Sequence, residues 1–205
     1  MRRLLFSLIF ISIGITSVRA QNLQYGLKAA LGFASQSMDN TTILSTNSVT
    51  TYSISAYVDI PFKMFYLQPG LNLVGKGVKQ YQEAQTNTIT LTYLDIPITA
   101  IYKFNLRTLG KLYVGAGPYA SIGLSGNNQV ESVSIISGSD VKFGNDQDYR
   151  KLDFGVNFAG GLELNNHLTF NMRYALGLNN IASDADLDAK SVKNRIFTIG
   201  LGFWL

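Results

Sequence analysis

Strict alternation of apolar with polar or small side chains recurs along most of this chain, and it constrains the fold more than any other feature. The last such stretch reads Ile-Phe-Thr-Ile-Gly-Leu-Gly-Phe-Trp-Leu from residue 196 to residue 205. Because successive side chains of a β-strand point to opposite sides of a sheet, each stretch predicts a strand with one apolar face. Eight segments share this pattern: residues 24–34, 51–60, 65–76, 89–104, 111–123, 152–164, 168–178 and 196–205.

The connections between these segments alternate in length. Residues 61–64, 105–110 and 165–167 are short enough for tight turns. The connections around 35–50, 82–88, 124–150 and 182–193 are mostly longer and rich in Ser, Asn, Asp and Thr. Short turns at one end and long polar loops at the other are typical of an outer-membrane barrel, with the short turns and both termini on the periplasmic side.

The apolar face of each segment must meet either lipid or a protein core, and a soluble β-sandwich also alternates. The apolar faces are almost free of charge over about nine residues, which is the length that crosses a bilayer at a steep tilt. The opposite faces carry glycine and tyrosine rather than the Lys, Glu and Thr of a solvated surface. Aromatic residues lie near the ends of the apolar faces, as in interfacial girdles: Tyr25, Phe33, Phe65, Tyr102, Phe104, Phe170 and Phe203. The sequence therefore predicts an all-β fold, an eight-stranded antiparallel up-and-down transmembrane barrel with a filled interior. The sandwich remains the alternative.

The N-terminus resembles a secretory signal peptide. Arg2 and Arg3 precede an apolar run over residues 4–15, and Val18-Arg19-Ala20 places small residues at the positions that a signal peptidase reads. We expect cleavage after Ala20, which leaves a barrel domain of residues 21–205. The alternative is a membrane anchor helix, for which the run is short. Removing three of the 17 basic residues leaves 14 against 13 acidic ones, so we expect no nucleic-acid partner.

Few residues are suited to catalysis or metal binding. The absence of cysteine excludes disulfides, zinc–thiolate sites and thiol nucleophiles. The only histidine, His167, falls in the short turn at 165–167, on the predicted periplasmic side, whereas a hydrolase of the outer leaflet needs its histidine near the opposite rim. Asp184, Asp186 and Asp188 lack the glycine and distal glutamate of an EF-hand, so a solvated loop is favoured over a weak calcium site. We expect no enzymatic activity, cofactor or metal.

The polar faces carry ionisable residues of both signs. In an eight-stranded barrel they would face a lumen that is just wide enough for side chains to fill. Opposite charges there would pair, since an isolated buried ion is costly. We expect an ion-pair and hydrogen-bond network that holds the strands in register, and the alternative is a path for protons or small ions. Its members would be Lys28, Asp59, Lys76, Asp95, Lys103, Asp153, Glu163 and Arg173.

Several short motifs carry a resemblance to a known family. They are Tyr93-Leu94-Asp95-Ile96-Pro97, the KLYVGAGPY stretch at 111–119, Asp153-Phe154-Gly155 with GGLE at 160–163, and the final strand at 195–205. Across nearly all of 21–205 the chain resembles the PorT-like outer-membrane β-barrel family of Bacteroidetes. The resemblance implies the barrel fold and an integral outer-membrane location. One departure is the end, where Leu205 follows the aromatic residues that the barrel assembly machinery is thought to read.

The family name comes from a component linked to type IX secretion. We therefore expect an envelope scaffold, a loop-mediated binder or a secretion and assembly accessory. The expected partners are outer-membrane lipid, the assembly machinery through the C-terminal strand, and a protein bound by the extracellular loops. The alternative function is a narrow porin-like channel for ions or small solutes, and a lipid-modifying or proteolytic barrel enzyme is a third hypothesis.

Overall fold

A computed structural model describes residues 23–38, 45–82, 85–132, 136–144, 147–182 and 191–205. These residues form ten antiparallel β-strands. None of them belongs to a helix long and apolar enough to cross a membrane. The strands are β1 (Gln24–Met38), β2 (Ser45–Asn47), β3 (Val49–Phe62), β4 (Phe65–Gln82), β5 (Gln85–Asn105), β6 (Gly110–Ser132), β7 (Ile136–Val141), β8 (Leu152–Leu164), β9 (Leu168–Gly177) and β10 (Val192–Trp204).

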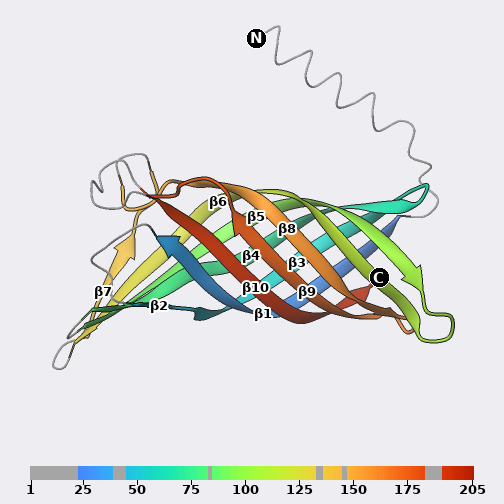
Figure 1. Ribbon diagram of the computed structural model, residues 1–205, viewed down its shortest axis with the longest axis horizontal. Helices are drawn as coiled ribbons and strands as arrows, with labels where there is room; N and C mark the ends of the chain where they lie inside the picture. The colour runs from blue at the N-terminus through green and yellow to red at the C-terminus, as the bar shows by residue number, and fades with distance from the viewer. Residues whose placement is uncertain (1–22, 39–44, 83–84, 133–135, 145–146, 183–190) are drawn as a thin grey trace, which may run out of the picture.

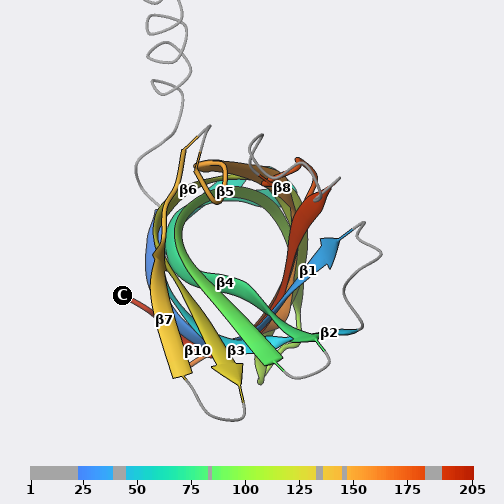
Figure 2. The same cartoon turned by 90° about the vertical axis from the view of Figure 1, so that its left-hand side faces the viewer.

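Eight of these strands close into a barrel (Figures 1 and 2). Going around the ring, the order is β1, β3, β4, β5, β6, β8, β9 and β10, and β10 pairs with β1 from Gly26–Trp204 to Met38–Val192. Closure leaves no unpaired strand edge inside the bilayer, where each unsatisfied backbone group is costly. The predicted eight-stranded up-and-down barrel is confirmed, and β8 has the predicted bounds.

Tight turns join the strands at one end of the barrel. The turns β3–β4, β5–β6 and β8–β9 each contain one non-glycine residue with a positive φ, which are Lys63 (51°), Arg107 (57°) and His167 (72°). This left-handed backbone is uncommon outside turns. β1 begins and β10 ends at the same end, as Figure 1 shows. We call it the short-turn end and the opposite one the long-loop end.

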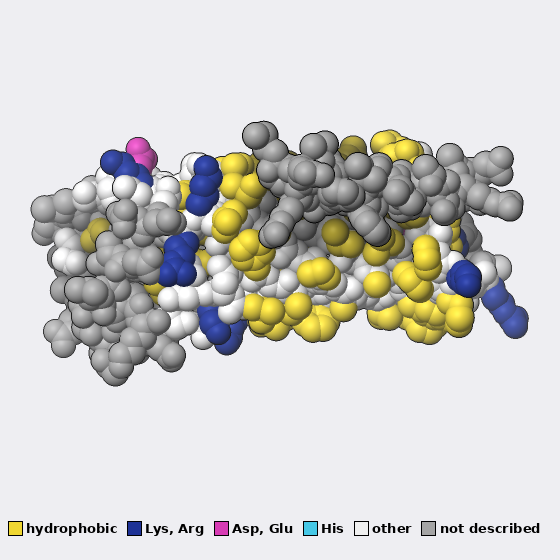
Figure 3. Space-filling model, turned by 90° about the horizontal axis from the view of Figure 1, so that it is seen from above, with side chains coloured by type: hydrophobic (Ala, Val, Ile, Leu, Met, Phe, Trp, Pro, Cys, Tyr) yellow, Lys and Arg dark blue, Asp and Glu magenta, His cyan; other side chains and the backbone are white. Residues whose placement is uncertain are grey.

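A band of apolar side chains covers the outside of the barrel. On β10, Phe197, Ile199, Leu201 and Phe203 are exposed while Thr198 and Trp204 are buried. On the face shown in Figure 3, hydrophobic side chains form a broad belt, and Lys and Arg side chains gather near both of its ends. An exposed apolar belt of this kind is the lipid-facing surface of a transmembrane barrel.

Three strands continue past the barrel at the long-loop end. β4 and β5 stay paired out to Gln82–Gln85, and β5 and β6 stay paired out to Gln85–Ser132. The short β2 pairs with β4, and β7 folds back on β6. The result is a sheet in the order β2-β4-β5-β6-β7, which we call the distal sheet (Figure 1).

The distal sheet corrects part of the sequence prediction. Residues 85–88 were expected in a loop but lie in β5. Residues 124–132 fall in the long connection 124–150 of the sequence prediction and lie in β6, which extends past the membrane in a hairpin with β7. Outside lipid, neither face of a strand has to be apolar, so the alternation that revealed the membrane-spanning segments fades there. The signal peptide, Ala20 and the three aspartates at 184, 186 and 188 lie outside the described residues.

Candidate functional site

The inner wall of the barrel carries the eight ionisable residues of the expected lumen network. They form two clusters at different heights rather than one network. The lower cluster, near the short-turn end, contains Lys28, Asp59, Lys103 and Glu163. The upper cluster contains Lys76, Asp95, Asp153 and Arg173.

The upper cluster is centred on Lys76, which is 1% exposed. Its Nζ lies 3.1 Å from Asp95 Oδ1 and 2.9 Å from Asp153 Oδ2. Arg173 Nη2 lies 3.0 Å from Asp95 Oδ2. Polar neighbours complete the cluster, since Ser121 Oγ donates to Asp95 at 2.5 Å. Asn194 donates to Asp153 Oδ2 at 2.9 Å. Two cations and two anions therefore balance in this site, where Lys76, Asp95 and Asp153 are buried and Arg173 is 16% exposed, and the pairing offsets the desolvation of the buried ions.

The lower cluster is built around Lys103. Its Nζ lies 2.6 Å from Asp59 Oδ2 and 2.6 Å from Glu163 Oε2. Lys28 lies within 4.0 Å of no carboxylate among the described residues, and its Nζ instead donates to Gln68 Oε1 at 3.1 Å. Gln68 Nε2 donates in turn to Asp59 at 2.6 Å. Trp204 closes this cluster, because its ring lies 4.8 Å from Lys103 Nζ.

A small cavity of about 60 Å³ lies between the two clusters. Lys28, Tyr57, Asn72 and Arg173 are among the residues that line it. The volume suits a few water molecules, since the lining is polar and a single water needs about 10–15 Å³ by this measure. The cavity therefore has room for solvent between the two sets of ion pairs.

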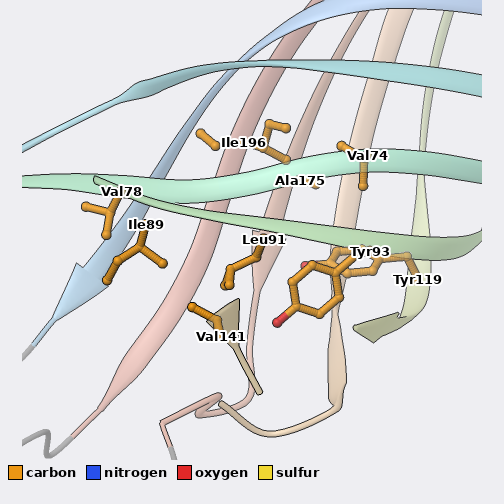
Figure 4. Packing of buried hydrophobic residues seen from close by; sticks show 10 residues of the cluster. Val74, Val78, Ile89, Leu91, Tyr93, Tyr119, Val141, Ala175 and Ile196 are labelled. Atoms are coloured by element: carbon orange, nitrogen blue, oxygen red, sulfur yellow. The ribbon is translucent and has the colours of Figure 1, made fainter. Parts of the chain in front are cut away.

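Apolar side chains fill the lumen above the upper cluster, at the long-loop end. Val74, Val78, Leu91 and Tyr93 are fully buried there, and Figure 4 shows them along the adjacent strands β4 and β5. Phe143 packs against this group, and its ring meets that of Tyr93 edge-on at 5.5 Å. We call it the apolar plug; its further members are Ala34, Ile89, Tyr119, Val141, Ala175 and Ile196.

The sequence did not predict the apolar plug. Alternation shows which residues share a face, but an apolar inward side chain looks the same as an apolar lipid-facing one. One signal was available in the sequence. Val74, Val78 and Leu91 occupy the same alternating positions as the inward polar residues of β4 and β5. Side chains thus fill the lumen at three levels, which are the lower cluster, the upper cluster and the apolar plug.

His167 belongs to neither ion-pair cluster, although it lines a pocket at the short-turn end together with Glu163 and Trp204. It occupies the β8–β9 turn at the short-turn end, where its Nδ1 lies 3.2 Å from the carbonyl oxygen of Trp204. Its ring stacks on Phe203 with centroids 5.9 Å apart. Within the described part of the chain, no group of three or more His, Asp or Glu side chains is placed to hold a metal ion. These contacts give His167 a structural role in the turn.

Comparison with known families agrees with the fold. The sequence model of the outer membrane protein beta-barrel domain matches residues 19–183. The chain belongs to this family. Membership in this family indicates that the protein is located in the outer membrane, where its apolar belt contacts lipid. No curated protein matches its sequence.

Solved outer-membrane barrels share the fold at low sequence identity. Neisserial surface protein A is 15% identical, with a TM-score of 0.49, over 89% of this chain and 99% of that chain. The attachment invasion locus protein Ail of Yersinia pestis is 10% identical, with a TM-score of 0.41, over 89% and 98%. The outer membrane enzyme PagL is 12% identical, with a TM-score of 0.46, over 86% and 98%.

One sequence prediction is corrected by these comparisons. The chain was expected to have no enzymatic activity, and that conclusion was wrong because an outer membrane enzyme, PagL, is among the similar barrels.

Proposed function

We propose that this outer-membrane barrel binds a protein partner at the cell surface through the distal sheet, with the barrel as a rigid anchor. The main support is the continuity of β4, β5 and β6 from the membrane belt into the sheet. Binding surfaces work best when a stable scaffold holds them, because little conformational entropy is then lost on association. A continuous strand is the stiffest link that the fold offers.

The edge strand β7 gives this surface its mode of binding. Ser137, Gly138, Ser139 and Asp140 are all exposed, and a Cβ built on Gly138 meets no atom within 4 Å. Among the described residues β7 pairs only with β6, apart from the bridge that follows it. Small side chains leave the backbone of an edge accessible, so an extended partner segment would add to the sheet by main-chain hydrogen bonds.

The filled lumen supports an anchor over the alternative of a narrow channel. Two ion-pair clusters and the apolar plug occupy successive levels of the barrel. Permeation would require the charged pairs to separate and the plug to open. Planar-bilayer recording tests this directly: we expect no conductance steps from the pure refolded protein, and regular steps would favour the channel.

The finer assignment rests on the motifs at 93–97, 111–119, 153–155 and 160–163. They support a PorT-like protein of Bacteroidetes, made with a signal peptide that is cleaved after Ala20 and assembled through its C-terminal strand. In that setting the surface partner would belong to a secretion or envelope assembly. Co-purification of the protein from intact membranes with secretion components would support this role.

Photo-crosslinking in intact cells tests the binding surface. A photoreactive residue at Ser137 or Ser139 is expected to give one adduct of discrete mass, and the same residue at Lys63 in a short turn is not.

A second experiment deletes parts of the distal sheet. Removing residues 79–82 together with 85–88 shortens the β4–β5 hairpin by paired positions and keeps the barrel register. Removing 127–140 deletes all of β7 except Val141, together with the outer end of β6. Both variants should fold, as heat-modifiable gel migration reports, yet fail to complement a deletion strain. Full complementation by both would contradict the proposal.

A further inference from the structure

A fork in the sheet lies at the long-loop end of β6. β6 pairs with β8 up to Ile122–Leu152, and with β7 only from Gly126–Val141 outward. The residues between these two pairings face the space between β7 and β8. The fork stays closed at its base, because the Gly123 N–H donates to the Lys151 carbonyl oxygen at 2.8 Å.

An open groove of about 570 Å³ occupies this fork. Lys142 follows β7 on one side, Lys151 precedes β8 on the other, and Leu124 and Phe143 supply the apolar wall. Both lysines are exposed. The groove therefore has an amine on each side and an apolar surface between them.

The groove lies at the outer limit of the apolar belt. Leu124 on β6 is 54% exposed and Leu152 on β8 is 49% exposed, and both are large apolar side chains beside the fork. Figure 3 shows Lys and Arg side chains gathered where the belt meets the long-loop end. A ligand in the groove would thus touch the belt on one side and water on the other, which is the position of a lipid headgroup.

The charge of the groove selects an anion. No carboxylate is among the residues that line it. Within the described part of the chain, neither lysine amine forms an ion pair. Asp140 and Asp153 are the acidic residues nearest to Lys142 and Lys151 in sequence, and neither lines the groove. Asp148 accepts a hydrogen bond from the backbone N–H of Lys142 at 2.8 Å. Two uncompensated ammonium groups are suited to bind a phosphate.

We propose that the fork binds a phosphorylated glycolipid of the outer leaflet, with phosphate between Lys142 and Lys151 and an acyl chain along Leu124 and Leu152. A soluble phosphate compound would use the amines but not the exposed leucines. The continuity of the groove with the belt therefore favours a lipid. This site lies at the base of β7, where Val141 lines it, and it does not depend on the partner proposed for the distal sheet.

The test compares two double variants that remove the same charge from the same end of the barrel. K142Q/K151Q alters the fork, and K193Q/R195Q alters exposed residues of β10 outside it. Each protein is refolded in zwitterionic detergent and titrated with lipid A, and bound lipid is counted by native mass spectrometry. Each basic side chain near an anionic surface contributes about a fivefold increase in affinity, so the fork variant is expected to bind roughly 25-fold more weakly. The β10 variant is expected to bind like the wild type.

Two further measurements define the ligand. Dephosphorylated lipid A should lose most of its affinity for the wild type, and inorganic phosphate should compete only weakly because it lacks acyl chains. L124S should weaken lipid A binding while both lysines remain. Equal losses in both double variants would show diffuse surface attraction, and unchanged binding by K142Q/K151Q would exclude the fork; either result overturns the proposal. All five substituted residues are exposed, so heat-modifiable gel migration should be unchanged in every variant.

Discussion

Replacing Lys76 by methionine should be among the most destabilising single changes in the lumen. Lys76 is the only cation within 4.0 Å of Asp153 among the described residues, and it shares Asp95 with Arg173. Methionine has a similar length without the charge. The substitution would leave Asp153, which is 0% exposed, with the amide of Asn194 as its polar partner. The upper cluster would then carry one uncompensated negative charge.

The expected loss in the free energy of unfolding follows from this uncompensated charge. Removing one partner of a buried ion pair costs about 3–5 kcal/mol in the free energy of unfolding, because the remaining charge stays buried. With a slope of about 2 kcal/mol per M of urea, the midpoint of unfolding should fall by about 2 M. Lys193→Met removes the same charge from an exposed site on β10 and should change the free energy by less than about 0.5 kcal/mol.

The assay is equilibrium unfolding in urea of protein refolded into lipid vesicles, followed by far-ultraviolet circular dichroism. The decisive comparison adds Asp153→Asn to Lys76→Met, which leaves the Asp95–Arg173 ion pair and a neutral cluster. The double variant should recover about 2 kcal/mol relative to Lys76→Met, since balanced removal of a buried pair is often nearly neutral. If Lys76→Met cost under 1 kcal/mol, or if the second change deepened the loss, the upper cluster would not be a tightly coupled, dry ion-pair site.

Three further predictions concern packing and processing. Leu91→Ala in the apolar plug should cost about 2–5 kcal/mol in the same assay, whereas Leu71→Ala on the lipid face should cost less than about 1 kcal/mol; equal costs would contradict the plug. Gly161→Ala should destabilise the barrel by about 1–3 kcal/mol, because a Cβ there would lie 2.1 Å from the Phe170 carbonyl oxygen, while Gly138→Ala, with open space around it, should be silent. Mass spectrometry of protein isolated from outer membranes should give a mature chain that begins at Gln21, and an intact N-terminus would contradict a cleaved signal peptide.

The membrane-spanning part of the fold could be predicted from the sequence because lipid imposes a simple rule. Every outward residue in the bilayer must be apolar, so alternation marks each strand, and β8 was predicted with its observed bounds. This requirement for apolar outward residues does not apply to the parts of the strands that lie outside the lipid. β7 and the outer halves of β5 and β6 contain many Ser, Thr, Asn and Gly residues, which are also common in loops.

The interior was harder to predict than the wall. The sequence predicted that the eight ionisable residues lie on the inner face. The structure adds that they form two separate clusters, the lower and the upper. Residues that are close in space come from different strands, such as Lys76 on β4 and Asp153 on β8. Their pairing depends on strand stagger, which one sequence does not contain. The fork groove could not be predicted either, because it forms where β6 changes its pairing partner from β8 to β7, and one sequence does not show that change.

Trp204 gives the barrel a built-in reporter of closure. It is the only tryptophan of the chain, and it lies on β10, the strand that pairs with β1 to complete the ring. Its ring is 6% exposed and meets Tyr57 of β3 edge-on at 4.7 Å. That contact spans the seam, so it forms only when the first and last strands meet. The fluorescence of one residue would therefore time the final step of barrel folding separately from membrane insertion, without any added label.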